Sequence, residues 1–199
     1  MEIVTQEAAS QLGVSQRQVQ RLARGGRFVS RTVAGRTVLA GRSLVAVSRS
    51  RGRGRRWDDR TVAAAAELLD SGSTETIEGS QRSRLRARLR TISMQELAYQ
   101  VLGDRVTLWR STRSSPGAGG LVDGLSSTGE GLEVKVVQNA TTFARRARLL
   151  EDADGGVLLI ELDTKAPSVV AEVALYAYGD VRTSNIAQQR VQERQAALK

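Results

Sequence analysis

The 199-residue sequence contains no cysteine and no histidine. Without cysteine the chain has no disulfides, thiolate zinc sites or cysteine nucleophiles. Without histidine it has no Ser-His-Asp triad and no histidine-ligated metal. It also lacks the side chain that most often serves as a general base near neutral pH. Catalysis would have to rest on carboxylates, lysine, tyrosine or serine alone. We therefore predict a protein that is not an enzyme and that uses no cofactor and no metal.

Long hydrophobic runs are also missing. No apolar segment approaches the roughly 18 residues that span a bilayer, and the first residues lack the basic-then-apolar order of a signal peptide. Hydrophobic residues make up 40% of the chain and charged residues 26%, which is typical of a folded protein. We expect a cytoplasmic protein with no membrane partner, built as one large or two small domains.

Positive charge is concentrated at one end of the chain. The net charge is +9, and residues 1–60 carry thirteen arginines against four acids. Residues 61–112 have a net charge of +1 and residues 113–199 of −1. Arginine supplies 27 of the 30 basic residues, but a compositional bias would spread evenly along the chain. The local basic block therefore favours a polyanionic partner, most often nucleic acid.

The first 48 residues show the pattern of a winged helix-turn-helix. Thr5 and Ser15 are expected to cap two helices, Gly13 lies in the turn between them, and Gly25-Gly26 ends the second. Two strands joined at Ala34-Gly35 then form a hairpin, the wing. The expected elements are helices over residues 6–12 and 16–24, strands over 28–33 and 36–39, and a short helix over 44–47.

Residues 49–56 are rich in arginine, glycine and serine and have no apolar anchor, so we expect a mobile basic linker. Residues 57–112 predict a helical, winged-helix-like middle segment, with a helix capped by Asp58 or Asp59, helices over 81–90 and 94–102, and a strand over 105–110. Residues 113–131 are expected to form a Gly/Ser-rich loop. The fold class predicted for the whole chain is α+β.

Residues 132–199 predict a small C-terminal α/β domain that binds a partner or effector. Its expected elements are strands over 132–137 and 156–162 and helices over 142–150, 167–178 and 184–198. Pro167 suits the first turn of its helix.

The helix over residues 16–24 carries the chemistry expected of a DNA-recognition helix. Its apolar residues Val19 and Leu22 would face the first helix, while its polar residues would project outward. Glutamine can bond adenine bidentately and arginine can bond guanine or phosphate. The predicted partner is double-stranded DNA. The residues expected to contact it are Ser15, Gln16, Arg17, Gln18, Gln20, Arg21, Arg24, Arg31 and Arg36.

About 45 residues at the N-terminus resemble the excisionase and MerR-like winged helix-turn-helix family. The resemblance is carried by Glu7-Ala8-Ala9-x-x-Leu12-Gly13-Val14-Ser15, Val19-x-x-Leu22, Gly26 and Gly35-Arg36. It implies that the helix over residues 15–24 enters a major groove of DNA. The hairpin would then lie on the DNA backbone or in the minor groove.

The whole chain resembles the AbiEi-type antitoxin-regulators, in their actinobacterial form. The stretches that carry this resemblance are Trp57 with the 63–69 run, Ser83-x-Leu85-x-x-x-Leu89, Arg105-Val106, Leu132-x-Val134-x-Val136-Val137, Ala174-Leu175 and Gly179-Asp180-x-Arg182-Thr183. The resemblance implies an autoregulator of a toxin–antitoxin or phage-defence operon, whose partner is a nucleotidyltransferase toxin. The operator, the oligomeric state and the ligand of the C-terminal zone stay open.

Two alternatives remain. One is a plain repressor or an excisionase-like DNA-binding protein. The other is a Mg²⁺-dependent nuclease, because Asp123 followed by Glu133-Val134-Lys135 fits the Asp…Glu-x-Lys pattern in which carboxylates hold the metal and lysine assists the attacking water. The same alternation of apolar and charged residues is also what any half-buried strand looks like.

Overall fold

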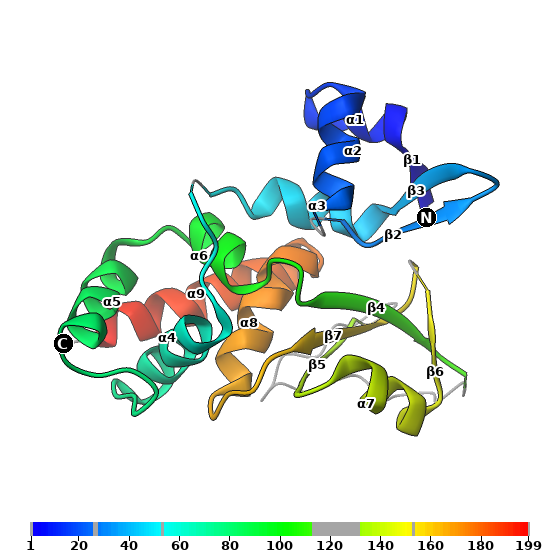
Figure 1. Cartoon of the computed structure of the whole chain (residues 1–199). Helices are drawn as coiled ribbons and strands as arrows, with labels where there is room; N and C mark the ends of the chain where they lie inside the picture. The colour runs from blue at the N-terminus through cyan, green and yellow to red at the C-terminus, as the bar shows by residue number, and fades with distance from the viewer. Residues whose placement is uncertain (1, 26–27, 53, 113–131, 153, 199) are drawn as a thin grey trace.

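A computed structural model describes residues 2–25, 28–52, 54–112, 132–152 and 154–198 (Figure 1). Across these residues the fold is a mixed α+β structure of nine helices and two small sheets, which confirms the predicted fold class. Within the same residues, no helix is both long enough and apolar enough to cross a membrane.

The first 49 residues form a small unit around a three-stranded antiparallel sheet in the order β1-β3-β2. Ile3, Val19, Phe28 and Leu39 are buried between the sheet and the helices. Its elements are β1 (Glu2–Val4), α1 (Thr5–Leu12), α2 (Gln16–Arg24), β2 (Ser30–Val33), β3 (Arg36–Ala40) and α3 (Gly41–Arg49). The predicted hairpin is present, and Ala34 and Gly35 both have positive φ values, as a two-residue type I′ turn requires.

Two details of this unit differ from the sequence prediction. β1 was not predicted, and it leads directly into α1, so Thr5 is not the cap of that helix. The capping position is Val4, which pairs with Val38 of β3, and Thr5 is buried as the first helical residue. The third helix is also longer than expected and reaches Arg49.

Although residues 49–56 have no apolar anchor of their own, Arg49, Gly52 and Gly54 contact the helices of the body. Arg49 donates hydrogen bonds to the carbonyl oxygens of Tyr176 and Gly179, at 3.2 and 2.7 Å. Gly52 packs on the ring of Tyr99, and the Tyr99 hydroxyl donates to the carbonyl of Gly54 at 3.0 Å. The anchoring groups come from helices far along the chain, which the composition of residues 49–56 cannot reveal.

The remaining described residues form one body around a four-stranded sheet, in which α8 and the helices beside it pack against one face and α7 packs against the other (Figure 1). The strand order is β5-β7-β4-β6, with β5 and β7 parallel and the other neighbours antiparallel. Its elements are α4 (Asp59–Ser71), α5 (Gly79–Thr91), α6 (Met94–Val101), β4 (Val106–Ser111), β5 (Glu133–Val137), α7 (Ala140–Ala147), β6 (Leu149–Glu151), β7 (Val157–Glu161), α8 (Pro167–Tyr178) and α9 (Val181–Ala197).

The expected division of this body at residues 113–131 is therefore wrong. Strand β4 belongs to the predicted middle segment, yet it lies between β7 and β6 of the predicted C-terminal domain. Helix α8 is buried along most of its length among α3, α4, α6, α9 and β5. The largest hydrophobic cluster includes buried residues from Val62 of α4 to Leu198, together with Ala40 and Ala46 of the N-terminal unit, and a smaller cluster lies around Ala144 of α7. Residues 113–131, the predicted loop, lie outside the described residues.

A buried ion pair joins the helices of the body. Glu172 of α8 is 2% exposed and accepts hydrogen bonds from Arg194 of α9 at 3.1 and 3.4 Å. Arg194 also contacts Asp70 at the end of α4, at 2.9 Å. Arg194 thus joins the consecutive helices α8 and α9 to α4, which lies about a hundred residues earlier in the sequence.

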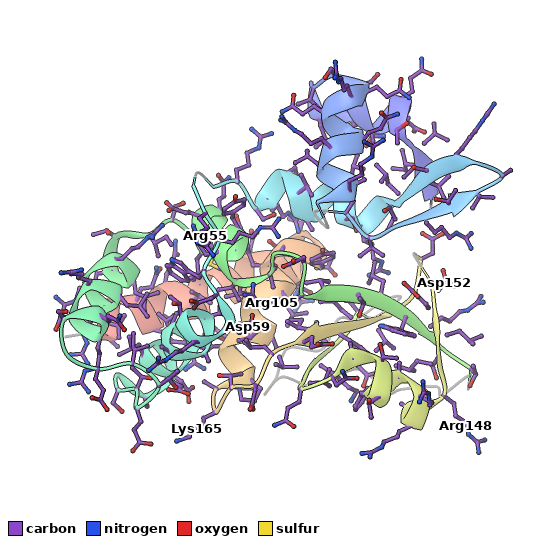
Figure 2. The ribbon with its side chains drawn as sticks, viewed as in Figure 1. Arg55, Asp59, Arg105, Arg148, Asp152 and Lys165 are labelled. Atoms are coloured by element: carbon purple, nitrogen blue, oxygen red, sulfur yellow. The ribbon has the colours of Figure 1, made fainter. Side chains whose placement is uncertain are left out.

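Most helix starts in the body agree with the sequence prediction. Asp58 caps α4, Ser93 caps α6 and Pro167 begins α8. At α6 the Ser93 hydroxyl accepts a hydrogen bond from the Glu96 N–H at 3.2 Å, while the carboxylate of Glu96 pairs with Arg88 at 2.8 Å. Helix α7 ends three residues earlier than predicted: Arg148, labelled in Figure 2, adopts a left-handed conformation, and the chain continues as β6, which pairs with β4.

Candidate nucleic-acid interface

Helix α2 is set by its two ends and by one buried residue. Gly13 ends α1 with a φ of +65°, and the Ser15 hydroxyl accepts a hydrogen bond from the backbone N–H of Gln18 at 3.2 Å. Val19 is fully buried against α1 and the sheet. Because a helix turns about 100° per residue, burial of Val19 leaves the polar side of α2 in solvent.

Every residue that the sequence assigned to DNA contact lies on the surface. Their side chains are solvent-exposed, so none serves in the core. These residues are Ser15, Gln16, Arg17, Gln18, Gln20, Arg21, Arg24, Arg31 and Arg36.

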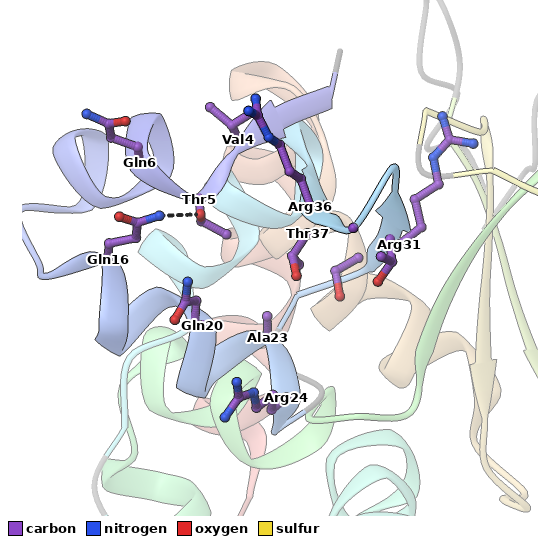
Figure 3. A pocket seen from close by; sticks show the side chains of 13 residues that line it. Val4, Thr5, Gln6, Gln16, Gln20, Ala23, Arg24, Arg31, Arg36 and Thr37 are labelled. Carbon is purple, nitrogen blue, oxygen red and sulfur yellow. Dashed lines mark hydrogen bonds between the residues drawn. The ribbon is translucent and has the colours of Figure 1, made fainter.

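Five of the nine line a groove of about 820 Å³ between α2 and the β2–β3 hairpin (Figure 3). They are Gln16, Gln20 and Arg24 of the helix and Arg31 and Arg36 of the hairpin. The groove is polar and cationic, and none of the described residues that line it is acidic. Its complete lining is Val4, Thr5, Gln6, Gln16, Gln20, Ala23, Arg24, Ser30, Arg31, Thr32, Gly35, Arg36 and Thr37.

The other four predicted residues lie outside the groove. By helical geometry Arg17 and Arg21 lie about 100° and 140° around the axis from Gln16, next to Arg24 on the exposed side. Gln18 lies about 200° away, on the side opposite the groove. The Ser15 hydroxyl already accepts the capping hydrogen bond of α2. The structure thus separates Gln18 from the remaining polar residues of this helix.

The sequence prediction missed three threonines that line the groove. Thr32 and Thr37 face each other across the hairpin, and the alternation of side chains along a strand places them on the opposite face from Arg31 and Arg36. Thr5 was expected to cap α1, and instead its hydroxyl oxygen accepts a hydrogen bond from Gln16 Nε2 at 3.0 Å. No sequence pattern pairs these two residues.

The three groove arginines set the electrostatics of the surface. Arginine stays protonated at all physiological pH values, and its planar fork matches phosphate oxygens. Arg24 is on α2, whereas Arg31 and Arg36 are on opposite strands of the hairpin. A concave surface with cations on both walls attracts a polyanion between them.

The structure joins two of the three residues of the alternative nuclease pattern. Glu133 and Lys135 lie on the same face of β5 and form an ion pair at 2.7 Å. Asp123 lies outside the described residues. Within the described chain, no three acidic side chains lie close enough together to hold a metal ion.

Comparisons of the chain with protein-family models, curated proteins and solved structures found no match.

Proposed function

We propose that the chain is a sequence-specific, DNA-binding transcriptional regulator whose first 49 residues act as a winged helix-turn-helix. The observation that carries this proposal is the groove between α2 and the hairpin, which holds Arg24, Arg31 and Arg36 and has no acid among the described residues that line it. Residues 1–49 carry +6 of the net charge of +9.

In the proposed complex α2 enters the major groove, which is wide enough for one helix. Gln16, Arg17, Gln20 and Arg21 face the base edges, and the hairpin arginines neutralise phosphates beside the helix. Phosphate contacts supply most of the affinity and set the register, whereas the glutamine and arginine contacts supply sequence preference.

The setting that we propose is an autoregulating antitoxin of a toxin–antitoxin or phage-defence operon. The N-terminal unit would bind the operon's promoter, and the body would bind a nucleotidyltransferase toxin. Residues 61–199 have a net charge of zero and supply most of the largest hydrophobic cluster, which suits a role in protein binding. A plain repressor or an excisionase-like protein is the alternative that uses the same DNA contacts.

The nuclease alternative has one observation in its favour, the placement of Glu133 and Lys135 on one face of β5. In that case the N-terminal unit would target DNA and the body would cleave it. The two functions differ in whether the DNA product is intact, which a cleavage assay decides.

The test of DNA binding is the simultaneous replacement of Arg24, Arg31 and Arg36 by alanine. Each phosphate contact contributes about 0.9 to the slope of log K against log[salt], so the slope should fall by about 2.7. The matched control is the triple alanine variant of Arg82, Arg145 and Arg146, which are exposed on α5 and α7. Equal losses in both variants, measured by fluorescence anisotropy with a duplex of mixed sequence, would refute the proposed interface.

A further inference from the structure

The three glutamines of α2 have different surroundings. Gln16 donates a hydrogen bond from Nε2 to Thr5 Oγ1 at 3.0 Å, and both residues line the groove (Figure 3). Gln20 lines the same groove, but within the described residues nothing hydrogen-bonds its amide. Gln18 lies on the opposite side of the helix. Only one of the three amides is therefore both held in place and turned toward the groove.

Thr5 is a rigid acceptor for this hydrogen bond. It is 8% exposed and is the first residue of α1, immediately after Val4, which pairs with Val38 of the central strand β3. Its β-branched side chain has few rotamers, so the hydroxyl occupies a defined position. The hydrogen bond thus fixes Gln16 to the sheet that also carries the hairpin.

The hydrogen bond leaves a donor and an acceptor of Gln16 unused. One N–H is engaged by Thr5, and in Figure 3 the amide oxygen points away from Thr5. The oxygen and the second N–H form the pair that matches the N6–H donor and the N7 acceptor of adenine in the major groove. Gln16 is also the first residue of α2, and N-terminal residues of a recognition helix are those that reach base edges.

A glutamine side chain that is ordered before DNA binds loses less conformational entropy when it contacts a base. A free glutamine side chain loses considerable rotamer entropy when it is held against a base. Gln16 is already held by Thr5, whereas Gln20 must be ordered by the DNA itself. Preorganised contacts of this kind discriminate more sharply than mobile ones.

We propose that Gln16 reads one adenine and that Thr5 is its positioning residue. This inference rests on the proposed DNA-binding function, and it adds which amide sets a base preference and what holds that amide in place. Thr5 itself touches no base. Its hydroxyl acts only through Gln16.

The experiment selects bound duplexes from a library with a randomised core and sequences them. The full chain is compared with four variants, Thr5→Val, Thr5→Ser, Gln16→Ala and Gln20→Ala. With Gln16→Ala, the preference for adenine at one position should fall by roughly tenfold. Thr5→Val, which keeps the shape and removes the acceptor, should weaken the preference at that same position. Thr5→Ser, which keeps the hydroxyl, should restore it.

Affinity for a fixed duplex of scrambled sequence separates positioning from folding. In Thr5→Val and Thr5→Ser it should be unchanged, because Thr5 touches no base and the phosphate contacts remain, and the far-ultraviolet circular dichroism melt should show each variant folded. Loss of affinity for the scrambled duplex in Thr5→Val would mean that Thr5 is merely structural, and would overturn the inference.

Two other results would overturn it while leaving the proposed function intact. One is a wild-type motif that Thr5→Val leaves unchanged. The other is a motif in which Gln20→Ala, and not Gln16→Ala, removes the adenine preference. If the wild-type chain selects no motif at all, the proposed sequence-specific function fails, and this inference fails with it.

Discussion

The N-terminal unit and the body are built from contacts of different range. In the N-terminal unit, β2 and β3 are separated by two residues and α1 and α2 by three. In the body, β4 pairs with β6 and β7, which follow it by about forty and fifty residues. The unit, residues 1–49, carries +6 of the net charge of +9, and the longer body carries +3. Most of the excess charge thus lies in the region with the short connections, whereas long-range strand pairing builds the sheet of the body.

The two regions should therefore differ in how strongly single substitutions lower their stability. The N-terminal unit combines local turns with the long-range pairing of β1 and β3. In the body, Glu172 and Arg194 form a buried contact, and Arg194 also reaches Asp70, which lies 124 residues earlier in the chain. The largest effects of substitution should therefore fall in the body, even though the proposed function lies in the N-terminal unit.

The largest effect is expected for Arg194→Ala. This change leaves the buried carboxylate of Glu172 with Arg190 alone, at 4.0 Å. An uncompensated buried charge costs about 3–5 kcal/mol of unfolding free energy. Urea unfolding followed by tryptophan fluorescence measures it, because Trp57 and Trp109 both lie in the body.

Asp70→Asn is the control for that prediction. It removes the more exposed partner of the same arginine, so it should cost at most about 1 kcal/mol. Equal losses for the two variants would show that burial of Glu172 is not the cause. The contrast between the two regions would then be weaker than the fold suggests.

A second prediction concerns the joint between the two regions. The Arg49 guanidinium bonds the carbonyl oxygens of Tyr176 and Gly179 near the C-terminus of α8. Hydrogen bonds from charged groups contribute about 1.5–3 kcal/mol. Arg49→Ala should lower the unfolding free energy by an amount in this range and should speed hydrogen exchange at the last turn of α8.

Arg51 provides the matched control for the joint. It is an exposed arginine two residues further along the chain, and Arg51→Ala should leave both measurements unchanged. If Arg49→Ala has no more effect than Arg51→Ala, the linker does not fasten the N-terminal unit to the body. The original expectation of a mobile linker would then be right in solution.

The contrast in contact range also explains what the sequence could predict. Gly13, Ser15 and Ala34-Gly35 are local signals, and the helices and hairpin that they predicted are present. β1, the insertion of β4 between β6 and β7, and the anchoring of Arg49 depend on partners distant in sequence. No local pattern specifies such partners.

The candidate site also has some features that the sequence could predict and others that it could not. Exposure of the polar side of α2 follows from the helical period and the burial of Val19, so the residue types that line the groove were predictable. The pairing of Thr5 with Gln16 was not, because it depends on a strand that the sequence did not reveal. The departure of Gln18 from the groove could have been found by counting angles around the helix.

A smaller effect is expected on acidification. Asp58 and Asp180 cap α4 and α9, and hydrogen bonds from Thr61 and Thr183 hold the pKa of each carboxyl below its ordinary value. A depressed pKa means that the stabilisation is present above the unfolded pKa, near 4, and is lost as the pH falls through the lower folded value. Loss of one such cap costs about 1 kcal/mol.

The body should therefore lose stability below about pH 4 through these two caps. In the N-terminal unit the one side-chain cap of the described helices is Ser15, which does not titrate. Asp58→Asn and Asp180→Asn keep an oxygen acceptor and remove the titrating carboxyl group. When unfolding midpoints are recorded from pH 6 to pH 3, the midpoint of the double variant should therefore fall less at low pH than that of the wild type. An equal fall in both proteins would mean that other groups cause the acid sensitivity.

The smallest effect is the one predicted for Glu133. If the body were a nuclease, Glu133 and Lys135 would serve metal and water, and removal of one metal carboxylate would abolish cleavage. Their 2.7 Å ion pair instead satisfies both charges within β5. We therefore expect the purified chain to cut neither linear nor supercoiled DNA in Mg²⁺ or Mn²⁺. Glu133→Ala should leave DNA binding at its wild-type value, because the groove lies in the other region.

Metal-dependent cleavage that Glu133→Ala abolishes would reverse the comparison between the two regions. The body would then carry the chemistry, and the N-terminal unit would only deliver it to DNA.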